Sequence, residues 1–295
     1  MPQTLLSKSP GTFKTLPLKV QAEPQRLVYQ AHGAPINFQQ MLSRRQALEI
    51  ADPHCFEVDL ANLGVSVRLR LSWQGRDFWV LVRQVRPDRD DTVLKWISGY
   101  VPAHELQIPL LSAVQEVAEE CLIESEHGWL AGCYGSTWLP TPYEPVLRYW
   151  QSRHFQLEGI GGAEDWVRCA SQPLLECPRA YVHTPTASLQ LVYDMSLTLP
   201  ADVREPSLFH VDECLQEGRL LARLDRRRAD LFLLELSEGL PTGELFTLNR
   251  GRLEAVSGHG LWLSEAFAEQ RGWLVTQERV RFSQWRQRLS GAALA

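Results

Sequence analysis

Three glutamates in one short segment, Glu116, Glu119 and Glu120, have the residue type and spacing that a divalent cation requires. In an α-helix, at about 100° per residue, their side chains fall within a sector of roughly 100°. Carboxylates this close repel one another in water, and a hard cation with oxygen ligands relieves the repulsion. The segment could therefore support Mg²⁺-assisted phosphate chemistry, although a solvated acidic helix face would have the same composition.

The surrounding residues predict the helix that would position these carboxylates. Pro109 suits a first helical turn, where its missing N–H is not needed, and the run 110–123 contains neither glycine nor proline. Val114, Val117 and Cys121 form an apolar sector beside the acidic one. We expect one side of this helix to be buried and the adjacent side to present the carboxylates.

Strands are predicted upstream of the helix. Apolar residues alternate with polar ones over 65–71, and a turn at 73–76 leads into an apolar run at 78–82. A further strand is predicted over 92–97, and it ends at Ser98 and Gly99. The order is therefore strand, turn, strand, loop, strand, glycine turn and acidic helix.

This order and the residues within it resemble the catalytic segment of the Nudix hydrolase superfamily. The Nudix box runs Gly, five residues, Glu, seven residues, and then Arg-Glu-apolar-x-Glu-Glu-x-Gly-apolar. Here Gly99 is followed after five residues by Glu105, and after nine more by the segment 115–123, which reads Gln-Glu-Val-Ala-Glu-Glu-Cys-Leu-Ile. The strand 93–101 also resembles the family's strand leading into its glycine turn.

The resemblance implies a fold class, a metal and a reaction. The fold would be α+β, a Nudix-like mixed β-sheet sandwiched by helices. Glu116, Glu119 and Glu120 would be both the metal ligands and the catalytic residues, and the cofactor would be Mg²⁺ or Mn²⁺. The activity would be cleavage of a pyrophosphate bond in a nucleoside diphosphate derivative, with Gly99 and Glu105 as supporting residues.

Some residues depart from the family's pattern. Gln115 stands where the family has Arg, and a neutral amide can hydrogen-bond a carboxylate but cannot lower its pKa by charge. Leu122 replaces the glycine that ends the family's helix, and the spacer after Glu105 is two residues too long. The sequence therefore leaves two functions open: a divergent hydrolase, or a catalytically inactive Nudix-like module that binds a nucleotide or regulates.

The rest of the chain predicts a division into three parts. Residues 1–55 form an N-terminal extension with a hairpin at 16–31 and a helix at 38–50, and residues 56–200 form the Nudix-like domain with an irregular insertion near 132–180. Residues 201–295 form a C-terminal α+β extension that could pack into the same domain. It contains helices at 212–226, 264–270 and 279–289, a strand at 231–234 and a hairpin around 249–251.

The composition limits the class of partner. The 295-residue chain has a net charge of −5, which argues against a protein that binds a nucleic-acid backbone. The six cysteines form no C-x-x-C pair, no Gly-Lys dipeptide exists for an ATP-binding loop, and no segment reads as a signal peptide or membrane span. We expect a cytoplasmic protein whose partner is a nucleotide-like small molecule; a homodimer stays open. Ten tryptophans leave an interaction protein as a third class.

Overall fold

The structure, a computed structural model, describes residues 2–8, 13–86, 91–162, 165–216, 219–227 and 231–292. It is mostly β, with 55% strand and 13% helix. The α-helices in the described residues are α1 (Phe38–Arg44), α2 (Pro109–Glu120) and α3 (Phe282–Ala292). The expected α+β fold, a Nudix-like sheet sandwiched by helices, is therefore wrong, because strands rather than helices supply most of the layers.

Most of the strands in the described residues belong to one large mixed sheet of twenty strands. These strands are β1 (Gln3–Lys8), β7 (Asn62–Trp73), β8 (Arg76–Arg86), β9 (Asp91–Lys95), β10 (Ile97–Tyr100), β11 (Cys121–Ser125), β12 (Gly128–Tyr134), β13 (Thr137–Trp138), β14 (Tyr149–Gly159), β17 (Arg179–His183), β18 (Ser188–Thr198), β19 (Ser207–Gln216), β20 (Arg219–Leu224), β21 (Leu231–Ser237), β22 (Leu240–Asn249), β23 (Arg252–Val256), β24 (Trp262–Ser264), β25 (Gln270–Arg271), β26 (Leu274–Val275) and β27 (Arg279–Arg281). A five-stranded sheet contains β3 (Leu18–Glu23), β4 (Arg26–Ala31), β6 (Phe56–Leu60), β15 (Val167–Cys169) and β16 (Gln172–Pro173), and β2 (Lys14–Thr15) pairs with β5 (Ile36–Asn37).

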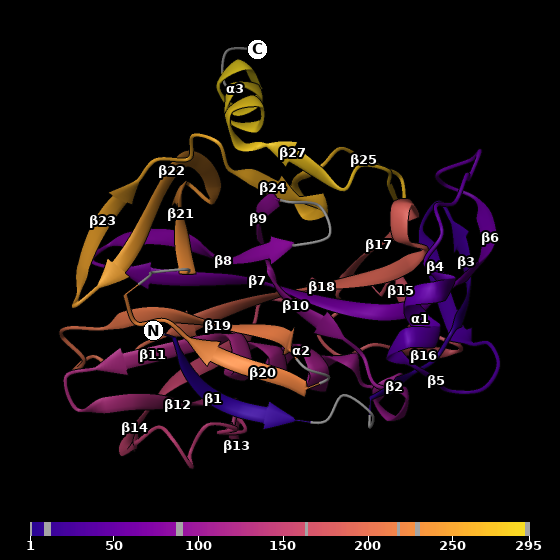
Figure 1. The fold of residues 1–295 in the computed structure, drawn as a ribbon. Helices are drawn as coiled ribbons and strands as arrows, with labels where there is room; N and C mark the ends of the chain where they lie inside the picture. The colour runs from indigo at the N-terminus through magenta and orange to yellow at the C-terminus, as the bar shows by residue number, and fades with distance from the viewer. Residues whose placement is uncertain are drawn as a thin grey trace.

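Strand β7 is the centre of the large sheet (Figure 1). It pairs antiparallel with β8 and β10 and parallel with β18. Its first six residues are all buried, which is typical of a strand covered on both faces. The glycine turn expected at Ser98 and Gly99 is wrong, because both residues lie within β10. Gly99 lies opposite Val65 of β7, so pairing with β7 fixes the position of this glycine relative to the helix that follows.

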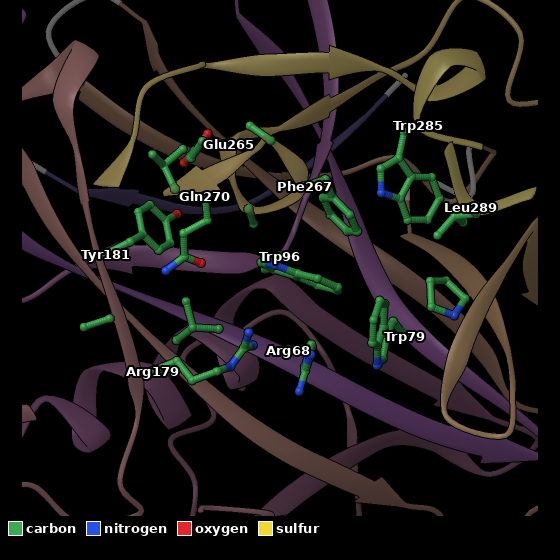
Figure 2. A pocket seen from close by; sticks show the side chains of 16 residues that line it. Arg68, Trp79, Trp96, Arg179, Tyr181, Glu265, Phe267, Gln270, Trp285 and Leu289 are labelled. Carbon is green, nitrogen blue, oxygen red and sulfur yellow. The ribbon is translucent and has the colours of Figure 1, made fainter. Parts of the chain in front are cut away.

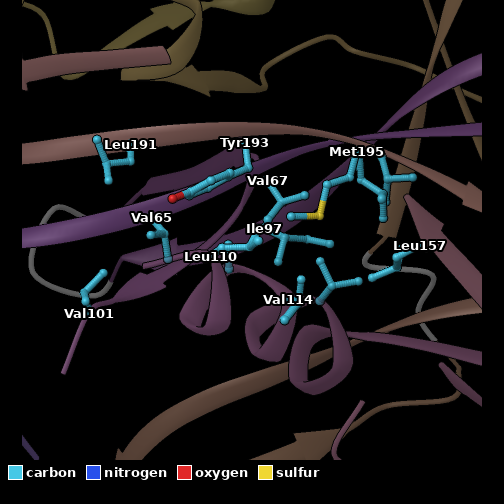
Figure 3. Close-up of a cluster of buried hydrophobic side chains, with 14 of the residues drawn as sticks. Val65, Val67, Ile97, Val101, Leu110, Val114, Leu157, Leu191, Tyr193 and Met195 are labelled. Atoms are coloured by element: carbon cyan, nitrogen blue, oxygen red, sulfur yellow. The ribbon is translucent and has the colours of Figure 1, made fainter. Parts of the chain in front are cut away.

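Helix α2 packs its apolar side on this part of the sheet. Leu110 and Val114 of the helix lie beneath Val65, Val67 and Ile97 in a single buried cluster (Figure 3). The helix begins at Pro109, as the sequence predicts. It ends at Glu120, so the expected continuation over 121–123 is wrong, and these residues belong to β11. Because the apolar side is buried, the neighbouring glutamates are held against the edge of the same core.

The region 212–226, predicted to be a helix, is instead a β-hairpin made by β19 and β20. Ala222 and Leu224 alternate with the more exposed Arg223 and are buried, which is the period of a strand. Strand β19 also pairs with β11, and β1 pairs with the other edge of β20. Pairing with segments far away in the sequence decides the structure here, and local sequence patterns do not register such pairing.

A second hydrophobic cluster lies in the C-terminal part of the chain. The hairpin predicted around 249–251 is confirmed as β22 and β23. The two helices predicted after it are a 3₁₀ turn at Glu265–Phe267 and helix α3. Phe282 and Trp285 of α3 pack with Leu81 and Trp96, so this cluster covers the face of the sheet away from α2.

Predictions for other elements agree with the structure to different extents. The hairpin at 16–31 is confirmed as β3 and β4, and α1 is shorter than the helix expected over 38–50. The region 132–180 contributes strands to both larger sheets, and the division into three parts stays a prediction. In the described residues, no helix is long and apolar enough to cross a membrane.

Candidate functional site

Gly99 and Glu116 touch at the edge of the core. A Cβ atom added to Gly99 would lie 1.7 Å from Oε1 of Glu116, which is far inside any permitted contact. The carboxylate therefore occupies the space that a larger residue at position 99 would need. Gly99 therefore does not make the turn expected from the sequence; it lies in β10 and admits this carboxylate against the backbone of that strand.

Glu116 and Glu120 lie one turn apart on α2, and both carry strongly shifted pKa values. Burial raises the pKa of Glu116 well above its usual value, and the charges of Glu120 and Glu119 raise it further. Burial also raises the pKa of Glu120 to about 7, against an opposing effect of Lys95. Without a cation, each of these carboxyl groups therefore tends to keep its proton near neutral pH.

The two carboxylate oxygens of Glu120 have different surroundings. Its Oε1 atom is 3.8 Å from Nζ of Lys95, and both side chains are 14% exposed. Lys95 is itself fixed by a 2.9 Å hydrogen bond from Nζ to Oγ of Ser98. The second carboxylate oxygen of Glu120, Oε2, is buried and has no hydrogen-bond partner. An oxygen in this state is costly unless a cation or another donor approaches it.

Glu119 is held in place by its neighbours. Nε2 of Gln115 donates a 2.7 Å hydrogen bond to Oε1 of Glu119, so this neutral amide binds a carboxylate. The hydroxyl of Tyr143 donates to the backbone carbonyl of Glu119. The end of α2 is thus fixed from two directions.

Glu105 lies apart from these three carboxylates. It belongs to a 3₁₀ turn at Ala103–Glu105, and its Oε2 atom accepts a 2.5 Å hydrogen bond from Ser112 of α2. Its other oxygen is 3.5 Å from Nε2 of His104. The contact with Ser112 holds the loop against the first turn of the helix.

The structure adds residues that the sequence did not indicate. Lys95 lies beside Glu120, while His210 and Glu213 come from β19. The charge of Glu213 raises the pKa values of both Glu116 and Glu120, and burial lowers the pKa of His210 to about 3, so this imidazole stays neutral. Alternation along the strand could have found Lys95, since 95, 97 and 99 share one side. Nothing local could have found Glu213, because its segment has the pattern of a helix.

Glu116 and Glu120 could supply part, but not all, of the ligands of a divalent cation. Across the described ranges, no three His, Cys, Asp or Glu side chains are placed to hold a metal ion by themselves. Mg²⁺, however, commonly takes one or two carboxylates and completes its shell with water and substrate phosphate. Glu116 and Glu120, with the buried and unpartnered Oε2 of Glu120, meet that smaller requirement.

Comparisons with protein-family models, with curated proteins and with solved structures found no match. The fold and site together define a mainly β protein with an acidic cluster, which we take as Glu116, Glu119, Glu120 and Glu213, at the end of a buried helix. The geometry of this cluster is therefore the basis for a functional proposal.

Proposed function

We propose that the protein is a Mg²⁺-dependent hydrolase that cleaves a pyrophosphate bond in a nucleoside diphosphate derivative. One observation carries the proposal: two glutamates with raised pKa values share a buried position, and one of their oxygens has no partner. Two carboxyl groups this close can both lose their protons near neutral pH only when a positive charge binds beside them. A divalent cation with a bound diphosphate supplies that charge.

The bound cation would neutralise the diphosphate and lower the pKa of a water molecule. Glu116 and Glu120 would hold it, and Gly99 would leave room for the first of these carboxylates. Gln115 keeps the Glu119 carboxylate in a fixed direction. Lys95, fixed by Ser98, would add positive charge beside the phosphate groups. Each role belongs to a residue whose side chain already has a defined position.

The second candidate is a nucleotide-binding or regulatory module without catalytic activity. Its support is Lys95, whose ammonium group lies 3.8 Å from Glu120 and already compensates part of the negative charge. The lack, within the described residues, of three metal-ligating side chains in one place also favours it. On this alternative the cluster needs no cation to be stable.

A first experiment measures cation binding without any nucleotide. Mn²⁺ binding, followed by calorimetry or by electron paramagnetic resonance, is expected for the unchanged protein and should weaken about tenfold or more in Glu120→Gln. Glu254→Gln is the matched control, because it removes the same charge from an exposed position on β23. Binding that is equal in all three proteins would place the cation elsewhere.

A second experiment separates the two candidates. Nucleotide sugars, dinucleoside polyphosphates and NADH are offered with Mg²⁺ or Mn²⁺, and hydrolysis is compared between the unchanged protein, Glu116→Gln and Glu120→Gln. Turnover that needs the cation and both glutamates supports the hydrolase. Nucleotide binding without turnover supports the module, and activity that survives both substitutions contradicts the proposed site.

A further inference from the structure

A second site lies on the other face of the sheet. A cavity of about 260 Å³ lies between strands of the large sheet and the C-terminal segments (Figure 2). Trp96, which lines it, directly follows Lys95 in the chain but packs in the C-terminal cluster, whereas Lys95 lies beside Glu120. Neighbouring residues of an extended chain point to opposite faces, so the cavity is separate from the acidic cluster.

Aromatic rings form one part of the cavity wall. The ring centroids of Trp96 and Phe267 are 4.5 Å apart, with 31° between their planes. Trp79 meets Trp96 edge to face at 5.3 Å, and Trp285 meets Phe267 in the same way at 5.4 Å. These rings come from four separate parts of the chain. Trp96 and Trp285 are buried, so the ring surface left for a planar ligand is that of the partly exposed Trp79 and Phe267.

Two arginines line another part of the wall. Arg68 binds Asp194 through two hydrogen bonds of 2.6 and 2.7 Å, and Nη2 of Arg179 approaches the same carboxylate at 3.3 Å. The guanidinium of Arg68 also lies 5.0 Å from the ring centre of Trp79. Two positive groups thus share one negative group, and Arg179 keeps 55% of its side chain exposed, so this wall can accept an anionic group.

The wall opposite the arginines presents oxygen atoms. In Figure 2, Glu265, Gln270 and Tyr181 gather across the cavity from Arg68 and Arg179. Nε2 of Gln270 donates to the carbonyl of Gly272, which fixes its amide and leaves its carbonyl oxygen to accept a hydrogen bond. Burial, together with the charge of Glu265, raises the pKa of Tyr181 well above its usual value, so its hydroxyl keeps its proton.

We propose that this cavity binds a small purine nucleotide, with the base against the partly exposed ring of Phe267 and the phosphate at Arg179. The oxygens of Glu265 and Gln270 accept hydrogen bonds from the N–H groups on the edge of the base, because a carboxylate can only accept. The volume lies near the lower limit of ligand pockets, about 300 Å³, which suits a monophosphate rather than a larger cofactor. The site does not depend on the proposed hydrolase activity.

The test measures binding of GMP to the full chain in the presence of EDTA, which removes any contribution of divalent cations. Calorimetry gives the affinity, and quenching of tryptophan fluorescence reports stacking. We expect GMP to bind, guanosine to bind at least tenfold more weakly, and Arg179→Gln to lose a similar factor for GMP. Phe267→Leu should weaken both GMP and guanosine, because it removes a stacking surface.

Arg252→Gln is the matched control, since Arg252 is exposed on β23 and does not line the cavity. Circular dichroism spectra and melting temperatures of the variants should match the unchanged protein. The proposal is overturned if millimolar GMP does not bind, or if Arg179→Gln binds it as well as the unchanged protein does. It is also overturned if inorganic phosphate binds as tightly as GMP, because the aromatic wall would then contribute nothing.

Discussion

At the scale of single residues, the carboxyl groups of the acidic cluster repel one another when they are ionised in the folded protein. The pKa of Glu120 is about 7 in the folded state, against an ordinary value of 4.5, and that of Glu116 is raised in the same direction. A carboxyl group with a raised pKa binds its proton more tightly when folded than when unfolded. The free energy of unfolding that the bound proton of Glu120 contributes is therefore fully present below about pH 4.5. It is lost as the pH rises towards 7.

This shift predicts how stability depends on pH. In EDTA, the free energy of unfolding of the unchanged protein should fall by about 3 kcal/mol more than that of Glu120→Gln between pH 4.5 and 7.5. Urea denaturation at a series of pH values measures the difference between the two proteins, which cancels the effect of carboxylates elsewhere. Glu254→Gln should follow the unchanged protein. Parallel curves for Glu120→Gln and the unchanged protein would mean that folding does not raise the pKa of Glu120.

Gly99 permits a second test at the same scale. Gly99→Ala places a methyl group where the Glu116 carboxylate lies, and we expect it to destabilise the protein by about 1–3 kcal/mol. The same substitution in a Glu116→Ala background should cost less, because the clashing group is absent. Urea denaturation of the four proteins gives the coupling energy, expected to be about 0.5–3 kcal/mol. A coupling near zero would show that Glu116 does not occupy this space in solution.

At the scale of elements, the sequence predicts helix α2 and the strands before it well. The apolar side of 110–120 has a helical period, Pro109 begins the helix, and the predicted strand over 65–71 lies within β7. These signals are local, since each depends on residues within a few positions of one another. The position of Gly99 beside Glu116 was not predicted, because it depends on the pairing of β10 with β7 and on the packing of α2.

The parts that could not be predicted depend on pairing between distant segments. The hairpin of β19 and β20 has the composition of a helix, but β11 and β1 lie at its two edges and satisfy its backbone groups as strands. The helix-sandwiched fold was expected from the box and the order of elements around it, which specify one helix and nothing of what covers the remaining sheet. His210 and Glu213 were missed for the same reason, because β19 carries both.

At the scale of the whole molecule, the N-terminal strand completes the large sheet. Strand β1 pairs antiparallel with β20 (Figure 1). Leu5 of β1 is buried in a cluster with Leu122 and Phe209. The backbone of β20 is thereby covered along the edge that faces away from β19. An exposed strand edge offers unpaired N–H and C=O groups to other chains, and removal of β1 would expose this edge of β20.

Removal of residues 1–8 should therefore change how the protein assembles. We expect the shortened chain to form larger species as its concentration rises, because β20 then pairs with a second copy. Light scattering after size-exclusion chromatography measures this.

Leu5→Ala is the control: it keeps the backbone of β1 and removes only a buried side chain, so it should lower stability by about 2–5 kcal/mol without new species. If the shortened chain keeps the size distribution of the full chain at every concentration, the edge of β20 is covered by something other than β1. Equal self-association of Leu5→Ala would instead attribute the effect to lost packing, and the two proteins together separate strand pairing from burial as the role of the N-terminal segment.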